Sequence, residues 1–124
     1  MTQRWFTPDS ARKALEAARP AAERMCRIYD GLEDLRPAEI VSDQHVEPGY
    51  FRLVEKLNQA METLSHIGAQ VKDAKHGLID FPARRSGRPV LLCWKVGESS
   101  LMFWHELDAG FAGRQPVDDD GPWE

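Results

Sequence analysis

The chain has 124 residues, a length that fits one domain and is short for two. Its 20 acidic and 16 basic residues give a formal net charge of −4, which argues against a general nucleic-acid-binding protein. The two cysteines lie far apart, and no apolar run has the length of a signal peptide or a membrane span. We therefore expect a cytoplasmic protein without a disulfide framework that does not enter a membrane.

The negative charge is concentrated at one end of the chain. Residues 1–116 carry equal numbers of basic and acidic residues, so this part is formally neutral. Residues 117–124 hold four acidic residues and no basic one. We expect residues 1–116 to form a single domain and residues 117–124 to form an acidic flexible tail.

Two amphipathic helices are predicted in the first half of the chain, as a helical hairpin over residues 7–68. Thr7 is the expected N-cap of the first helix, and a proline follows it at the first helical position. Pro20 lies inside the apolar stripe and predicts a kink, while Gly31 is the expected stop. A second stripe predicts a helix over residues 48–67, antiparallel to the first.

After residue 68 the apolar residues alternate or run in short blocks between glycine-containing turns, which is typical of strands. An antiparallel β-meander is predicted over residues 69–116, with Pro82 closing one of its strands. The fold class is therefore α+β, with a helical hairpin packed on a three- or four-stranded antiparallel sheet. The expected strands cover residues 70–72, 78–81, 90–96 and 101–107.

The pairing of the last two strands decides which side chains share a face. A four-residue turn at 97–100 would place Leu92 opposite His105 on the core face. The opposite face would then carry Trp104 beside Met102 as exposed apolar surface. Such a surface favours contact with a second copy of the chain, because two-fold homodimers are the commonest oligomers.

Four residues are candidates for catalysis. Asp80, Glu106 and Asp108 offer carboxylates for acid–base work, and the predicted register places Asp80 and Glu106 on either side of Leu91. The alternative is that these acids are solvated strand and turn residues. His105 is a candidate base, or else a core histidine with its hydrogen bonds satisfied. The spacing of the four histidines matches no zinc motif, so no metal and no cofactor are predicted.

Three further residues are candidates for ligand binding, namely Lys72, Trp104 and Arg114. Arg114 ends a glycine-containing loop and could bind an anion, or it could pair with Asp108 or the tail. Cys93 would need a neighbouring base to act as a nucleophile, and the alternative is an inert packed thiol.

Three sequence blocks resemble a known family. They are Gly-Leu-Ile-Asp-Phe-Pro at 77–82, Leu-Cys-Trp-Lys-Val-Gly-Glu at 92–98 and the stretch from Trp104 to Arg114. The combination resembles a bacterial domain-of-unknown-function family over roughly residues 5–116. The family has no established activity, so the resemblance implies no catalytic residue. It does single out Lys72, Asp73, Asp80, Cys93, Trp94, Glu98, Trp104, His105, Asp108 and Arg114.

Three functions remain open from the sequence. The first is a homodimeric interaction module that uses the face of Trp104 and the helices. The second is a small hydrolase-like enzyme with a carboxylate and arginine site in the β-meander. The third is a weak nucleic-acid binder through the turn that holds Arg84, Arg85 and Arg88, although the charge of the chain makes nucleic acid a poor partner. The sequence does not identify a small-molecule ligand for Lys72, Trp104 and Arg114.

Overall fold

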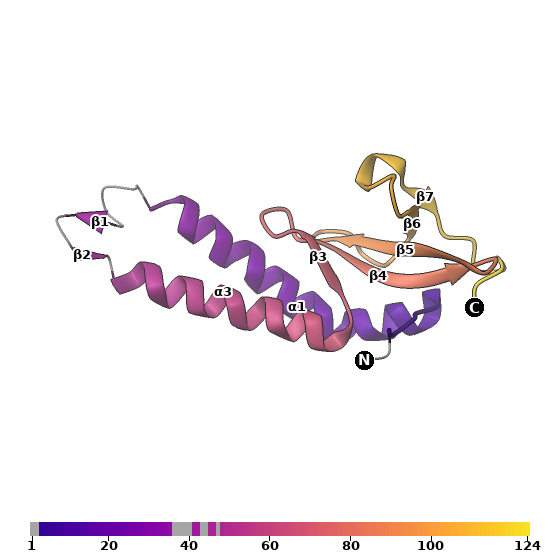
Figure 1. The fold of residues 1–124 in the computed structure, drawn as a ribbon, viewed down its shortest axis with the longest axis horizontal. Coiled ribbons are helices and arrows are strands. Elements are labelled where there is room, and N and C mark those ends of the chain that lie inside the picture. The colour runs from indigo at the N-terminus through magenta and orange to yellow at the C-terminus, as the bar shows by residue number, and fades with distance from the viewer. Residues whose placement is uncertain (1–2, 36–40, 43–44, 47) are drawn as a thin grey trace.

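The computed structural model describes residues 3–35, 41–42, 45–46 and 48–124. Two helices pack against a five-stranded antiparallel sheet, which confirms the predicted α+β class (Figure 1). The sheet has one strand more than the largest number expected. Among the helices in these ranges, none is long and apolar enough to cross a membrane.

Helix α1 spans Pro8–Glu33 and begins as the sequence predicts. The side chain of Thr7 accepts a hydrogen bond from the backbone N–H of Ser10, and Pro8 occupies the first turn. The helix is continuous through Pro20 and also through Gly31, so the prediction that Gly31 ends it is wrong. Gly31 instead lies inside the helix and faces the side chain of Leu53 in the second helix, at a distance that would also accommodate a methyl group.

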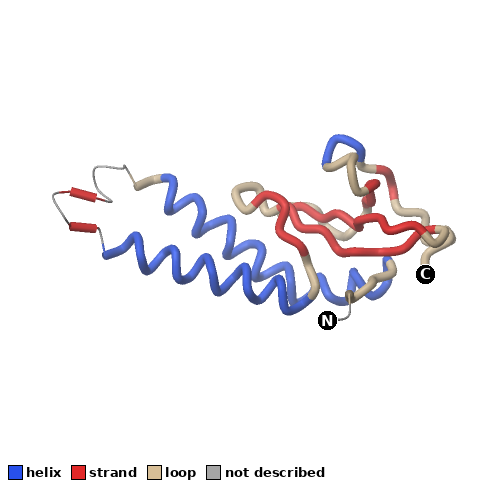
Figure 2. The backbone as a smooth tube through the Cα atoms, viewed as in Figure 1, coloured by secondary structure: helices blue, strands red, loops and turns tan. Residues whose placement is uncertain are grey.

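Helix α3 spans Pro48–Ile67 and ends where Gly68 adopts a φ of +106°. It lies beside α1 as the second arm of the helical hairpin (Figure 1). The short strands β1 (Val41–Ser42) and β2 (His45–Val46) pair at the far end of the hairpin. The five-stranded sheet lies over only one part of the hairpin, and the other part extends beyond it (Figure 2).

The sheet has the strand order β3-β4-β5-β6-β7, and every neighbouring pair is antiparallel. This is a meander, because strands that follow each other in the chain also lie side by side. The strands are β3 (Gln70–Asp73), β4 (Leu78–Arg85), β5 (Arg88–Lys95), β6 (Phe103–Glu106) and β7 (Gln115–Pro116).

Strand β4 continues through Pro82, so the prediction that this proline closes the strand is wrong. The backbone carbonyl of Pro82 accepts a hydrogen bond from Phe6 N–H at 2.7 Å, on the edge away from β5. The missing N–H of Pro82 therefore removes no bond between β4 and β5. The strand ends at the two-residue turn Ser86–Gly87, where both residues have positive φ as a type I′ hairpin requires.

The register of β5 against β6 differs by one residue from the prediction. Leu92 pairs with Trp104, and Leu91 pairs with His105. Because side chains alternate along a strand, this shift exchanges the two faces of β6. Trp104 now faces the core, and His105 faces away from the helices.

The connection between β5 and β6 explains the shift. A carboxylate oxygen of Glu98 accepts a hydrogen bond from the backbone N–H of Lys95, and the carbonyl of Glu98 accepts one from the indole of Trp94. Arg19 of α1 donates to the same carbonyl. Leu101 leaves the strand and is fully buried in the core. The connection is therefore longer than the expected four-residue turn, and β6 begins only at residue 103.

The acidic segment 117–124 lies against the sheet. Arg85 forms an ion pair with Asp118 at 2.7 Å, and its guanidinium stacks between the rings of Trp104 and Trp123. The two indoles meet edge to face at 5.9 Å. A backbone hydrogen bond also joins the N–H of Glu124 to the carbonyl oxygen of Arg84 in β4, at 3.1 Å. The expected flexibility of this segment stays a prediction, but its contacts attach it to the body of the protein.

Candidate functional site

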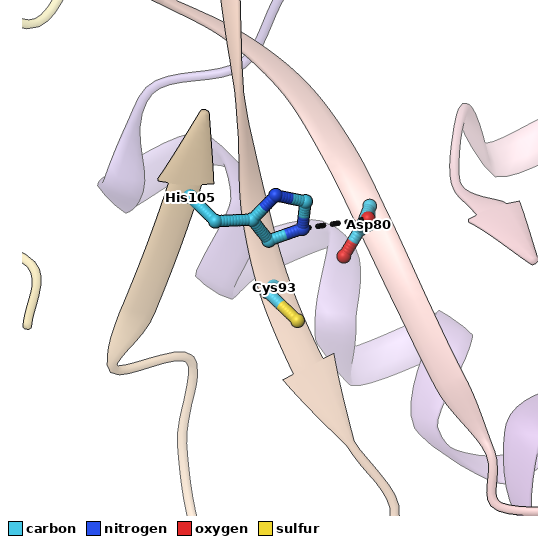
Figure 3. Close-up of side chains that lie close together, drawn as sticks. All are labelled: Asp80, Cys93 and His105. Carbon is cyan, nitrogen blue, oxygen red and sulfur yellow. Dashed lines mark hydrogen bonds and ion pairs between the residues drawn. The ribbon is translucent and has the colours of Figure 1, made fainter. Parts of the chain in front are cut away.

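Three neighbouring strands bring together one carboxylate, one thiol and one imidazole on the face of the sheet away from the helices. Asp80 of β4 pairs directly with Cys93 of β5, and His105 of β6 lies diagonally across from Cys93. Figure 3 shows the three side chains pointing toward a common place. One donor atom from each lies within 4.8 Å of the other two, and each residue is at most 3% exposed.

The imidazole of His105 has an acceptor at each ring nitrogen. Its Nε2 lies 3.0 Å from Asp80 Oδ2, and its Nδ1 lies 2.7 Å from the backbone carbonyl oxygen of Glu106. A carbonyl only accepts, so Nδ1 must carry a hydrogen and donate it. The hydrogen bond between Nε2 and Oδ2 needs a second proton. The Asp80–His105 pair therefore holds one proton in common, and it is neutral as a unit wherever that proton lies.

The second oxygen of Asp80, Oδ1, is buried and has no hydrogen-bond partner among the described residues. Most buried polar atoms in proteins have a partner, because an unpaired one costs about 1–3 kcal/mol. This unpartnered oxygen belongs to the same carboxylate that contacts His105. Apart from a weak hydrogen bond of the Cys93 thiol to this carboxylate, the acceptor capacity of Asp80 on this side is therefore not filled.

Burial raises the pKa of the Cys93 thiol, and the nearby carboxylate of Asp80 raises it further. The Cys93 thiol is therefore protonated at neutral pH. A nucleophilic cysteine requires the opposite shift, toward the thiolate. The direction of this pKa shift favours the second alternative for Cys93, an inert packed thiol, over a nucleophile.

The raised pKa of Cys93 predicts that stability falls in alkaline solution. Above the ordinary thiol value of 9.0, the unfolded chain releases this proton and the folded protein retains it. The unfolded state then binds fewer protons, so the free energy of unfolding decreases as pH rises, by up to about 1.4 kcal/mol per pH unit. Urea denaturation between about pH 9 and 11 measures the slope. Cys93→Ala is the matched variant and should show a shallower slope, whereas equal slopes would contradict the assignment.

A small pocket of about 150 Å³ opens onto the buried pair. Asp80 and His105 line its inner end, and Lys72 lies at its rim. Its apolar walls are Leu78, Leu91, Leu107 and Phe111. The lining residues do not include Cys93, so the thiol lies behind the carboxylate and the imidazole. The pocket thus gives a path from solvent to the buried cluster.

Two of the four catalytic candidates do not join this site. Glu106 points to the other face of β6 and forms an ion pair with Arg88 at 2.6 Å. Asp108 is exposed in the turn after β6. The expected pairing of Asp80 with Glu106 is therefore wrong, because the one-residue shift moves His105 into the place that Glu106 was expected to fill.

Of the three ligand-binding candidates, one lies at the pocket and two lie elsewhere. Lys72 lines the pocket, whereas Trp104 is only 5% exposed and packs in the core. Arg114 donates to both carboxylate oxygens of Glu98 at 2.7 Å, and it stacks on the ring of Phe103. The expected pairing of Arg114 with Asp108 or the tail is wrong. This arginine fixes the loop before β7 against the loop before β6.

The three arginines of the β4–β5 turn each have a partner within the chain. Arg84 stacks on the ring of Trp5 at 4.3 Å, and the other two form the ion pairs described above. The turn is therefore less available to phosphate groups than three free cations would be.

Cys93 was a candidate nucleophile in the sequence, but it was not expected to join Asp80 and His105. The direct pairing of Asp80 with Cys93 follows from a two-residue turn at Ser86–Gly87, which the sequence Arg-Ser-Gly-Arg contains. This turn would have placed the carboxylate opposite the thiol. The position of His105 depends on the longer connection after Lys95, for which no local motif gives a signal.

Comparison with known proteins gives one match. A protein-family model described as "Uncharacterized conserved protein (DUF2203)" matches residues 4–117. No curated protein and no solved structure matches the chain. The matched range includes the helical hairpin and every strand of the five-stranded sheet, and hence the whole Asp80–Cys93–His105 cluster. The chain therefore belongs to the DUF2203 family of uncharacterised conserved proteins.

Proposed function

We propose that this protein binds one divalent transition-metal ion, with zinc as the best fit, through Asp80, Cys93 and His105. The observation that carries the proposal is the meeting of these three side chains, one from each of three neighbouring strands, in a buried cluster within 4.8 Å. Thiolate sulfur, imidazole nitrogen and carboxylate oxygen are the donor types that zinc uses in proteins.

The spacing of the donor atoms supports a tetrahedral site. Metal–ligand bonds of about 2.0–2.3 Å place tetrahedral ligands roughly 3.3–3.6 Å from one another. His105 Nε2 and Asp80 Oδ2 are already 3.0 Å apart, and no pair in the cluster exceeds 4.8 Å. Binding therefore requires side-chain movements of about 1 Å, which rotation of the aspartate and cysteine side chains supplies.

The surroundings of the cluster also support a metal. A histidine that binds zinc through one nitrogen usually donates the hydrogen of the other to a carbonyl or carboxylate. His105 has this arrangement, since Nδ1 faces the carbonyl of Glu106 and Nε2 faces the cluster. A metal would also give the unpartnered Oδ1 of Asp80, or its neighbour Oδ2, a cationic partner.

The proton balance of binding follows from the hydrogen bonds. The metal takes the place of the thiol proton of Cys93 and of the proton shared by Asp80 and His105. Two protons are therefore released for each ion, and metal affinity rises with pH while both protons are present. The bound set then consists of a thiolate, a carboxylate and a neutral imidazole.

Cobalt(II) is the probe for this site, because a cobalt–thiolate bond gives a charge-transfer absorption in the near ultraviolet. Titration of the full chain should produce this band, saturating at one equivalent, and zinc should displace it. Cys93→Ser should abolish the band while the circular dichroism spectrum stays that of a folded protein. Loss of one ligand should weaken metal binding at least about 100-fold, since even outer partners of such ligands contribute 10–100-fold.

Cys26→Ser is the matched control, because Cys26 is the second free cysteine and lies in α1. This variant should keep the full cobalt band. The proposal is refuted if wild-type protein gives no thiolate band, or if the Cys93→Ser and Cys26→Ser variants bind cobalt equally well.

A site with three protein ligands and one open position is the pattern of catalytic rather than structural zinc. This favours the hydrolase-like enzyme as the activity built on the metal, in which a metal-bound water would be the nucleophile. The hydrolase-like site was expected to include Arg114, but Arg114 is bound to Glu98. The cationic side chain that lines the pocket is that of Lys72.

The cytoplasmic location stays a proposal, and the two free thiols support it because cysteine remains reduced in that compartment. The homodimer also stays a prediction. Its main support was an exposed Trp104, but Trp104 is buried in the core of one chain.

A further inference from the structure

We propose that the open position of the metal site takes a small monocarboxylate with a short apolar chain, held between the metal and Lys72. This inference rests on the proposed metal site and names the class of ligand that it serves. It is carried by the charge, the size and the wall chemistry of the pocket above Asp80 and His105.

The charge of the pocket selects an anion. A divalent metal with the Asp80 carboxylate, the Cys93 thiolate and neutral His105 has no net charge. Lys72 adds one positive charge at the rim, and within the described part of the chain no carboxylate or hydrogen-bond acceptor pairs with its ammonium group. A ligand with a single negative charge would therefore leave the pocket neutral.

The volume of the pocket and its wall residues indicate what the uncharged part of the ligand should be. The pocket volume of about 150 Å³ is below the roughly 300–1,000 Å³ of pockets that hold drug-sized ligands, so the pocket suits a smaller molecule. The side chains of Leu78, Leu91, Leu107 and Phe111 make its walls apolar. A phosphate dianion would need more donors than one lysine and one metal position offer. A carboxylate with a chain of two to four carbon atoms fits this pocket. Its charged end would meet the metal and Lys72, and its chain would contact the apolar walls.

The register of β3 explains why Lys72 lies at this pocket. Gln70 pairs with Asp80, and side chains alternate along a strand, so Lys72 lies on the same face of the sheet as Asp80. The neighbouring Lys75 differs, because it forms an ion pair with Glu33 at 3.2 Å.

The cobalt-loaded full chain provides the test, with butyrate as the probe and n-butanol as an uncharged molecule of similar size. Butyrate should change the visible absorption of the bound cobalt and saturate, whereas n-butanol should not. Lys72→Met should weaken butyrate binding about tenfold, as expected for loss of one favourable charge contact. Lys72→Arg should restore most of the affinity, and Lys75→Met should bind butyrate as the wild type does.

The inference is overturned if butyrate leaves the cobalt spectrum unchanged, if Lys72→Met binds butyrate as tightly as the wild type, or if inorganic phosphate binds more tightly than butyrate. These results leave the cobalt–thiolate band in place, so they are distinct from failure of the metal site. Absence of the band itself refutes the metal site and the carboxylate site together.

Discussion

Replacement of Asp80 by alanine should lower the free energy of unfolding of the metal-free protein by about 3–5 kcal/mol. The change removes the partner of a histidine that is only 3% exposed, and it leaves the Nε2 side of the ring without an acceptor. A domain of ordinary stability has about 5–15 kcal/mol in total, so this loss is a large fraction. Urea denaturation at pH 7 measures it.

Glu106→Ala is the matched control for this prediction. Glu106 follows His105 in the same strand, but its ion pair with Arg88 lies at the surface. Loss of an exposed ion pair costs less than about 1 kcal/mol. If Asp80→Ala and Glu106→Ala have equal small effects, the Asp80–His105 pair does not have the buried character that its geometry indicates.

Replacement of Trp104 by alanine should also cost about 3–5 kcal/mol, because Trp104 belongs to the core. The change removes a large ring from its contacts with Trp123 and with the guanidinium of Arg85. Thermal or urea unfolding measures the loss. The effect should be the same at low and high protein concentration, since the contacts that are lost lie within one chain.

Met102→Ala provides the comparison. Met102 lies two residues earlier and is 40% exposed, so its replacement should change stability by no more than about 0.5 kcal/mol. A Trp104→Ala variant that keeps its stability but loses self-association would support the exposed interaction face that the sequence predicted, and it would contradict the packing seen here.

Local motifs predicted the start of α1 and the end of α3, but not the ends of α1 and β4. Thr7 and Pro8 begin α1 as expected, because an N-cap depends only on residues within one turn. Gly68 ends α3 for a similar local reason. Pro82 was misread, because its tolerance within β4 depends on Phe6, a residue far away in the chain. The sequence around a proline does not reveal which edge of the strand its nitrogen faces.

The candidate site was predicted in part. Asp80 and His105 were both identified as candidates, but on opposite faces of the sheet. Their meeting depends on the one-residue shift in the pairing of β6 with β5, and the connection between these strands buries Leu101 and is held by Arg19 from α1. These contacts are tertiary, so neither alternation nor turn chemistry indicates them. The proposed metal ligands were not recognised as a set for the same reason, since they have no helical or local spacing.

The contact between Trp104 and Trp123 also has a consequence for how the chain is made. Synthesis proceeds from the N-terminus, so β6 leaves the ribosome before the segment that covers it. Until that segment has emerged, the indole of Trp104 lacks its contact with the ring of Trp123, and Arg85 lacks its ion pair with Asp118. During this interval the nascent protein displays an aromatic surface that the finished protein hides. Residues 117–124 therefore close this surface only after the rest of the sheet has emerged.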